Sequence, residues 1–146
     1  MNYLDTSVLI KRFVREPGSD VVAELLGSGE VVATAKITFA EVYSGLTRRF
    51  RQGDLSGRAY ALVCRQFERD WPGYLRVDLH DEILTSARDL IRRHPLRALD
   101  AIHLASALSL RKALGDEVTF AASDKRLIRA ADAERFKTLN VELERS

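Results

Sequence analysis

Four acidic residues of this 146-residue chain lie in segments that are otherwise rich in apolar side chains. They are Asp5, Glu41, Asp100 and Asp124. Buried carboxylates are rare unless they are paired or bind a metal, because removing a charge from water is energetically expensive. These four positions are therefore the first candidates for residues that do chemistry.

Each of the four acids also has an ordinary structural explanation. Asp5 and Asp124 could each cap the N-terminus of a following helix. Thr38 and Glu41 have the spacing of a capping box, and Asp100 could complement the dipole at the start of its helix. Considered one at a time, the four acids are explained more simply by these local roles than by catalysis.

The elements expected around the acids form an alternating series. Short apolar or β-branched strands are predicted at residues 1–5, 31–35, 74–79, 118–123 and 138–143. Helices are predicted at residues 7–15, 21–26 (capped by Ser19 or Asp20), 37–54, 55–71, 80–94, 97–114 and 124–136. Alternating strands and helices indicate an α/β fold with a parallel sheet, and the length fits a single domain over residues 1–146.

This topology would bring the four acids to one edge of the sheet. Asp5 ends the first predicted strand and Asp124 directly follows the fourth, and the carboxyl ends of parallel strands meet at the same edge. Glu41 and Asp100 lie early in helices that we expect to begin near that edge. Four carboxylates there would repel one another unless a divalent cation neutralised them. Oxygen ligands suit Mg²⁺ or Mn²⁺, and such a site can activate water and clamp phosphoryl oxygens.

Three further side chains could support this site. Thr6 and Ser123 each place a hydroxyl beside one of the aspartates, although both could act only as caps. His103 lies one helical turn after Asp100 and could support a ligand or contact substrate. A hydrogen-bonded core histidine is the simpler explanation, and the three histidines of the chain lack the spacing of a zinc site.

The charge balance permits a polyanionic partner without requiring one. The chain has 23 Lys and Arg against 21 Asp and Glu, a formal net charge of +2. Arginine, whose guanidinium suits bidentate phosphate contact, is concentrated at residues 48–76 and 88–97. The candidate phosphate contacts at the end of one predicted helix are Arg48, Arg49 and Arg51. A solvated helix face with scattered ion pairs is the alternative.

Several other classes of protein fit the sequence less well. Cys64 is the only cysteine, so no intramolecular disulfide can form, and a reducing, cytoplasmic location is expected. No apolar stretch approaches the ~20 residues that span a bilayer, and no signal peptide is recognised. A haloacid-dehalogenase-type phosphatase would need a second aspartate at Ser7, and a P-loop motif is absent.

The segments that carry the acids resemble the PIN-domain family, in particular the VapC-like toxins of bacterial and archaeal toxin–antitoxin pairs. The similar segments are "YLDTSVLIKRFVREPGS", "ITFAEVYSGLTRRF", "LRALDAIHLASAL" and "FAASDKRLIRAA". The resemblance covers essentially the whole chain and implies a three-layer α/β/α sandwich around a parallel sheet. By resemblance, a pocket that holds Mg²⁺ or Mn²⁺ would be formed by Asp5, Glu41, Asp100 and Asp124.

The resemblance also implies partners. Such toxins are held inactive by a cognate antitoxin whose C-terminal segment covers the pocket, and they commonly form homodimers. Apolar side chains of the early helices and of the helical pair that follows could form a groove for a partner helix, or belong to the core. They are Phe13, Val21, Val22, Leu25, Leu26, Tyr43 and Phe50.

The last motif departs slightly from the pattern of the family. Relatives often have threonine before the last aspartate, where this chain has Ser123, which retains the hydroxyl. Some relatives carry a further acid soon afterwards, whereas Lys125 and Arg126 follow here. Occupancy of a second metal position is therefore not implied by the sequence.

The sequence favours a metal-dependent endoribonuclease that acts as the toxin of a toxin–antitoxin pair. It would hydrolyse RNA phosphodiester bonds with a metal-activated water, and no membrane interaction is expected. The alternative is a catalytically silent module of the same fold that binds RNA or a partner protein. The four intact acids favour the enzyme, because a silent module does not need them.

Overall fold

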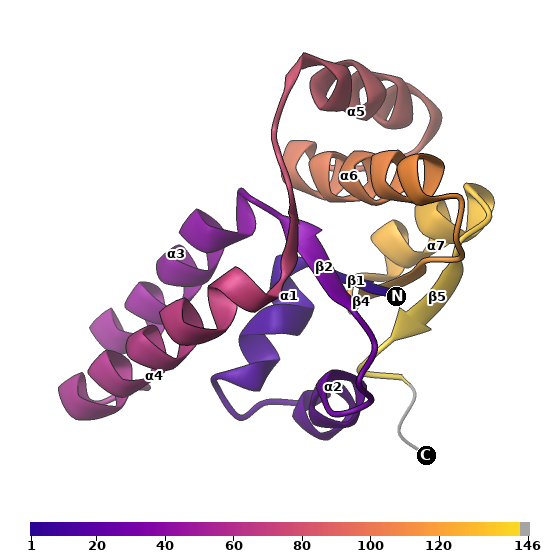
Figure 1. The fold of residues 1–146 in the computed structure, drawn as a ribbon. Helices are drawn as coiled ribbons and strands as arrows, with labels where there is room; N and C mark the ends of the chain where they lie inside the picture. The colour runs from indigo at the N-terminus through magenta and orange to yellow at the C-terminus, as the bar shows by residue number, and fades with distance from the viewer. Residues whose placement is uncertain (144–146) are drawn as a thin grey trace.

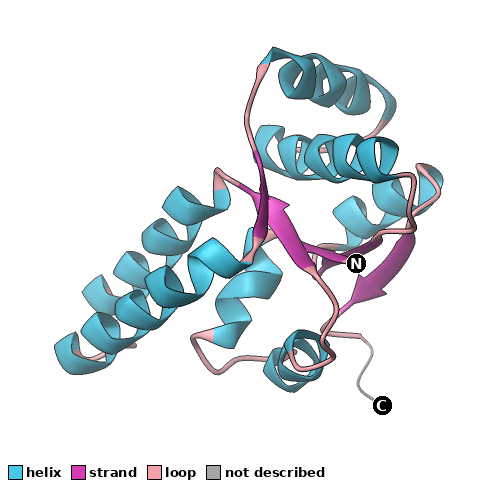
Figure 2. Cartoon of the chain, viewed as in Figure 1, coloured by secondary structure: helices cyan, strands magenta, loops and turns pink. Residues whose placement is uncertain are grey.

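Five short strands form one parallel sheet in the computed structural model, which describes residues 1–143 (Figures 1 and 2). The strands are β1 (Asn2–Leu4), β2 (Val32–Ala35), β3 (Leu75–Val77), β4 (Thr119–Ala122) and β5 (Lys137–Asn140). Their spatial order is β3-β2-β1-β4-β5, and every neighbouring pair is parallel. The predicted parallel sheet is therefore confirmed.

Helices cover both faces of this sheet, so the predicted three-layer α/β/α sandwich is also confirmed. One face carries α1 (Thr6–Leu9), the 3₁₀ helix η1 (Ile10–Arg12), α2 (Ser19–Leu26), α3 (Thr38–Arg51) and α4 (Gly57–Asp70). The other face carries α5 (Asp81–Arg93), α6 (Ala98–Leu114) and α7 (Lys125–Ala133). A second 3₁₀ helix, η2 (Trp71–Gly73), connects α4 to β3. Figure 1 shows α3 and α4 side by side, projecting from the sheet.

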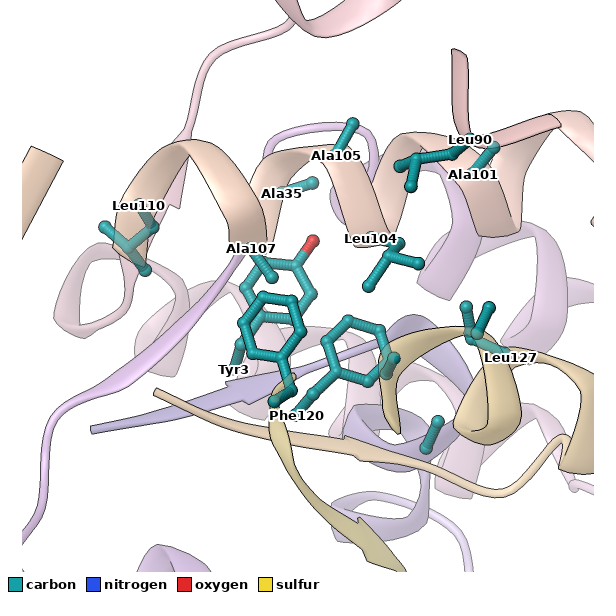
Figure 3. Packing of buried hydrophobic residues seen from close by; sticks show 14 of the residues in the cluster. Tyr3, Ala35, Leu90, Ala101, Leu104, Ala105, Ala107, Leu110, Phe120 and Leu127 are labelled. Atoms are coloured by element: carbon teal, nitrogen blue, oxygen red, sulfur yellow. The ribbon is translucent and has the colours of Figure 1, made fainter. Parts of the chain in front are cut away.

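The strands alternate their side chains between two cores. Tyr3 of β1 faces the core under α5, α6 and α7, whereas Leu4 faces the core under α1 to α4. Phe120 of β4 stacks on Tyr3, with ring centroids 5.4 Å apart and planes inclined by 7° (Figure 3). Helix α6 lies between α5 and the sheet and buries several small side chains.

The first predicted helix is shorter than the expected 7–15. It consists of α1 and η1, and the chain after Arg12 forms a loop that Ser19 holds in place. The Ser19 hydroxyl donates to the Val14 carbonyl at 3.2 Å and accepts from the Glu16 amide at 3.0 Å. The predicted cap of the next helix was wrong, because Gly18 is its N-cap and adopts φ +94°. A left-handed φ of this kind suits glycine.

The last predicted strand, 138–143, is shifted in the structure. β5 ends at Asn140, whose side-chain oxygen accepts from the Glu142 amide at 3.1 Å and turns the chain. Such an asparagine turn competes with strand pairing. Cys64 is partly buried against the core of α1 to α4. Among the described residues, no helix has the length and apolar character needed to cross a membrane.

Candidate active site

The strand order creates a switch point between β1 and β4. From β1 the sheet first grows through β2 to β3, and the chain then returns to the other side of β1 to add β4 and β5. In open α/β sheets, ligands bind outside the carboxyl ends of the strands at such a point. Asp5 follows β1 directly, and Ser123 and Asp124 follow β4 directly.

A cavity of about 470 Å³ opens at this edge of the sheet. Three of the four predicted acids, Asp5, Glu41 and Asp100, lie in its lining, together with Thr6 and His103. They come from three different places in the chain, the β1–α1 junction, α3 and α6, which the parallel sheet and its crossover helices bring together. The structure therefore places these predicted residues in one hollow.

Asp5 caps α1 and faces the cavity at the same time. Its Oδ1 accepts from the Val8 amide at 3.0 Å and from the Ser7 hydroxyl at 2.8 Å, so the capping interpretation is correct. Both bonds use Oδ1, and Oδ2 has no hydrogen-bond partner among residues 1–143. The residue is only 5% exposed. Burial raises the pKa of Asp5, and the charge of Asp100 adds to this rise.

Glu41 does not form the capping box that its spacing suggests. Ile37 is the N-cap of α3 without a side-chain cap, and the Thr38 hydroxyl instead pairs with that of Thr34 at 2.8 Å. Oε1 of Glu41 accepts from the Thr6 hydroxyl at 2.7 Å. Burial acts to raise the pKa of Glu41, but its bonds to His103 and Thr6 outweigh this and lower it.

His103 connects Glu41 to Tyr3 of the central strand β1. Its Nε2 lies 2.8 Å from Oε1 of Glu41, and its Nδ1 lies 2.8 Å from the Tyr3 hydroxyl. Burial raises the pKa of Tyr3 well above its ordinary value, so the phenol keeps its proton and can donate it to Nδ1. In the tautomer that accepts this bond at Nδ1, Nε2 carries the hydrogen that Glu41 accepts. His103 is thus a hydrogen-bonded core residue that also orients a candidate ligand.

Asp100 is held loosely, whereas Asp124 is fixed as a helix cap. Asp124 caps α7, because its Oδ1 accepts from the amides of Arg126 and Leu127 at 2.8 and 3.1 Å. Asp124 does not line the cavity, but its Oδ2 lies 3.8 Å from Nη2 of Arg97. Nε of the same arginine lies 3.8 Å from Oδ2 of Asp100. Burial raises the pKa of Asp100, and the charge of Asp124 adds to the rise.

The four carboxylates have the donor chemistry of a divalent-cation site. Asp5, Glu41 and Asp124 each commit one oxygen to hydrogen bonds within the protein, and their second oxygen accepts none from the described residues. Such unused oxygens are suitable ligands for Mg²⁺ or Mn²⁺. Within residues 1–143, however, no group of three or more His, Cys, Asp or Glu side chains is arranged so that it could hold a metal ion. The expected convergence on a cation stays a prediction.

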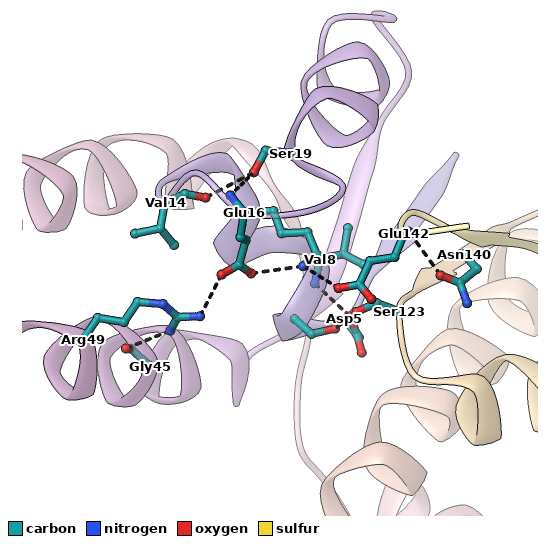
Figure 4. A network of polar contacts seen from close by, with 12 residues as sticks. Asp5, Val8, Val14, Glu16, Ser19, Gly45, Arg49, Ser123, Asn140 and Glu142 are labelled. Carbon is teal, nitrogen blue, oxygen red and sulfur yellow. Dashed lines mark hydrogen bonds and ion pairs between the residues drawn. The ribbon is translucent and has the colours of Figure 1, made fainter. Parts of the chain in front are cut away.

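The three arginines predicted as phosphate contacts differ in their surroundings. Arg48 is exposed at the cavity and has no ion-pair partner among the described residues. Arg49 is engaged, since its guanidinium contacts Glu16 at 3.1 Å and donates to the Gly45 carbonyl at 2.9 Å (Figure 4). Arg51 lies outside the cavity, in a neighbouring groove of about 670 Å³ that shares Arg48 with it.

Sequence reasoning missed two contributors to this site. Ser7 was not predicted to belong to the site, yet its hydroxyl donates to Asp5 and lies 3.1 Å from the hydroxyl of Ser123. Arg97 was grouped with a cluster of arginines, and nothing in the sequence alone singled it out as the neighbour of Asp100 and Asp124. Its position three residues before Asp100, at the start of the same helix, was the available signal.

The residues predicted to form a partner groove belong mainly to the core. Phe13 and Val22 are buried, whereas Phe50 is 41% exposed and stacks on Tyr60. A different hollow, of about 510 Å³, lies between the loop after η1 and the α3–α4 pair. Its apolar lining includes Val14 and Leu55.

Comparison with known proteins supports a single family. The family model for the PIN domain matches residues 3–133. Ribonuclease VapC45 of Mycobacterium tuberculosis (strain CDC 1551 / Oshkosh) is 33% identical over 132 residues, which cover 90% of this chain and 89% of that protein.

Solved structures share the fold at lower identity. A toxin–antitoxin complex from Klebsiella pneumoniae contains a chain with a TM-score of 0.67 and 17% identity, covering 97% of this chain and 98% of that one. VapC20 of Mycobacterium tuberculosis, a sarcin-ricin loop cleaving toxin, gives a TM-score of 0.64 at 17% identity, covering 96% and 98%. At this identity, the two structures show the fold alone.

Proposed function

The chain belongs to the PIN-domain family, and from this premise we propose that it is an endoribonuclease, the toxin of a toxin–antitoxin pair. The observation that carries the proposal is the cavity at the switch point of the sheet. Asp5, Glu41 and Asp100 line it, and Arg97 connects Asp124 to it. Ribonuclease VapC45 is similar over nine-tenths of the chain, which supports RNA as the substrate.

We propose Mg²⁺ or Mn²⁺ as the cofactor of this site. The residues that would hold it are Asp5, Glu41, Asp100 and Asp124, through the carboxylate oxygens that the protein does not use. When bound, the cation would lower the pKa of a water and neutralise charge at the phosphodiester. The protein's own part is to keep Glu41 ionised and fixed, which the bonds from Thr6 and His103 achieve.

RNA would approach along α3. The cavity and the neighbouring groove share Ser44 and Arg48, so a strand of RNA can pass from one to the other. Arg48 and Arg51 lie three residues apart and therefore on one side of the helix. We assign the phosphate contacts to these two residues. Arg49, whose guanidinium already contacts Glu16, serves as the matched comparison.

A partner protein would cover the same region. The hollow lined by Val14 and Leu55 shares Glu16 and Arg49 with the acidic cavity, so a bound segment could reach from one to the other. The related complex from Klebsiella pneumoniae pairs a toxin with an antitoxin, which supports an antitoxin as this partner. A homodimer of this chain stays a prediction that sedimentation of the purified protein would test.

Cleavage of labelled structured RNA tests the proposed activity. Wild-type protein should cut in Mg²⁺ or Mn²⁺ and stop in chelator. Asp100→Asn keeps the shape of the side chain but removes its charge, so cleavage should fall by about 100-fold or more while RNA still binds. Asp116→Asn, at an exposed aspartate after α6, is the matched control and should cut normally.

Two results would contradict this function. Wild-type protein that binds a broad panel of transfer and ribosomal RNA without cutting any of it would favour the silent module. Cleavage that persists in chelator and in Asp100→Asn would contradict the metal mechanism.

For the RNA path, Arg48→Gln should weaken RNA binding and flatten its salt dependence more than Arg49→Gln does. Equal effects of the two variants would argue against the assignment.

A further inference from the structure

We propose that Arg97 is an internal counter-ion of the acidic cavity. In the metal-free protein its guanidinium pairs with the carboxylates of Asp100 and Asp124, and the divalent cation displaces it toward the RNA phosphate. The inference rests on the proposed function, because it concerns the same site. It assigns a role to a residue outside the four acids. The role is to balance the charge of the outer carboxylates until metal and substrate arrive.

The position of Arg97 joins two separate parts of the fold. The residue is the N-cap of α6, and Asp100 lies one turn later on the same helix. Asp124 belongs to the β4–α7 connection. Nε and Nη2 of Arg97 lie 3.8 Å from Oδ2 of Asp100 and from Oδ2 of Asp124 respectively. One guanidinium therefore spans two candidate ligands that the chain does not otherwise connect.

No other arginine of the cavity has this role. Arg49 contacts Glu16 and the Gly45 carbonyl, and Arg48 has no carboxylate partner within residues 1–143. The carboxylate that Arg49 contacts is not one of the four candidate ligands. Arg97 is thus the arginine whose removal changes the charge balance at the candidate ligands themselves.

The contacts of Arg97 are of a kind that a divalent cation can displace. Its side chain is 82% exposed, and the distances of 3.8 Å are longer than those of a charge-assisted hydrogen bond. Exposed ion pairs of this type are weak and are screened by salt. Arginine and cation require the same oxygens, so each must weaken the binding of the other.

Once displaced, the guanidinium stays at the mouth of the cavity, because Arg97 is part of the lining. It carries five N–H donors in a geometry that suits a phosphate group. The phosphodiester of RNA would bring the negative charge that replaces the two carboxylates. Arg97 should therefore oppose metal binding and favour RNA binding, two effects of opposite sign from one side chain.

Binding of Mn²⁺ alone, followed by the electron paramagnetic resonance signal of the free ion, tests the first effect. Arg97→Gln should bind Mn²⁺ about three- to tenfold more tightly than wild type at low salt. The difference should shrink at high salt, where the ion pairs are screened. Arg92→Gln, at an exposed arginine of α5, is the control and should match wild type.

Binding of a cleavage-resistant phosphorothioate RNA in Mn²⁺ tests the second effect. Arg97→Gln should bind it several-fold more weakly, whereas Arg92→Gln should not. Mn²⁺ affinity that is unchanged or lower in Arg97→Gln would overturn the inference while leaving the proposed activity intact. A wild-type protein that binds no Mn²⁺ would overturn both, so the two failures are distinguishable.

Discussion

The candidate site has two halves that are built differently. The inner group consists of Tyr3, Thr6, Glu41 and His103, and the outer group consists of Arg97, Asp100 and Asp124. In the inner group, hydrogen bonds of 2.7 to 2.8 Å run from Tyr3 through His103 to Glu41 and from Thr6 to Glu41. In the outer group, the amides of α7 fix Asp124, but its connection to Asp100 consists of two contacts of 3.8 Å to an arginine that is 82% exposed.

The difference indicates which half is preorganised. The hydrogen bonds of the inner group keep Glu41 ionised, and they lower its pKa in spite of burial. In the outer group, burial and the neighbouring Asp124 raise the pKa of Asp100, so its charge is unfavourable without a cation. We infer that the inner group defines the shape of the site, whereas the outer group adjusts to what binds there. Asp5 lies between the two, with one oxygen fixed and the other unused.

Loss of His103 should cause the largest effect on stability. His103→Ala leaves the buried Tyr3 hydroxyl without its acceptor and removes a bond to Glu41, so we expect a loss of about 3 kcal/mol in the free energy of unfolding. Tyr3→Phe removes only the hydroxyl and should cost about 1 kcal/mol. Arg97→Gln, in the outer group, should stay within about 0.5 kcal/mol of wild type. Urea unfolding in chelator measures the stability of all three variants. If Arg97→Gln lost as much stability as the variants of the inner group, the inferred difference between the two groups would be wrong.

The pH dependence of stability should have opposite signs in the two halves. The pKa of Glu41 is lowered in the folded state, so its contribution is present above the ordinary glutamate pKa and is lost as the pH falls. The pKa of Asp100 is raised, so its charge destabilises the metal-free protein at neutral pH and this penalty is relieved on acidification. Glu41→Gln should therefore be less stable than wild type at neutral pH, and Asp100→Asn should be equally or more stable.

Unfolding in chelator at about pH 7.5 and at about pH 3.5, which lies below the ordinary glutamate pKa, measures this difference. Acidification should reduce the difference in the free energy of unfolding between each variant and wild type. For Glu41→Gln the difference that shrinks is a loss of stability, and for Asp100→Asn it is a gain. Asp116→Asn, at an exposed position, controls for the loss of one negative charge. If Asp100→Asn were destabilised at neutral pH as much as Glu41→Gln, the outer group would be as tightly organised as the inner one.

Much of the fold could be predicted from the sequence because its elements are short and clearly separated. Every strand was anticipated, since apolar β-branched runs alternate with amphipathic helices, and the parallel sheet follows from that alternation. Local polar contacts caused the errors. Ser19 was predicted to cap a helix but holds the preceding loop, and Asn140 ends β5 before the predicted boundary.

The site could be predicted only in part, for a related reason. The edge of the sheet at which Asp5 and Asp124 lie follows from the ends of two strands, which a sequence reveals. The partners of Glu41 cannot be recognised in the sequence in this way, because Thr6 and His103 lie 35 and 62 residues away along the chain. The capping-box interpretation of Glu41 was wrong because these distant partners bind its carboxylate.

The smallest predicted effects concern the two serines beside Asp5. Ser7 donates to Oδ1 of Asp5 at 2.8 Å, and the Ser123 hydroxyl has one hydrogen-bond partner within residues 1–143, the Ser7 hydroxyl at 3.1 Å. Ser7→Ala should cost about 1 kcal/mol, because it removes a bond to a buried carboxylate, whereas Ser123→Ala should cost less than about 0.5 kcal/mol. Ser7→Ala should also raise the pKa of Asp5 further, since this bond lowers it. Urea unfolding in chelator orders the two variants, and a larger loss for Ser123→Ala would show that Asp5 depends on the β4–α7 connection, which would join it to the outer group.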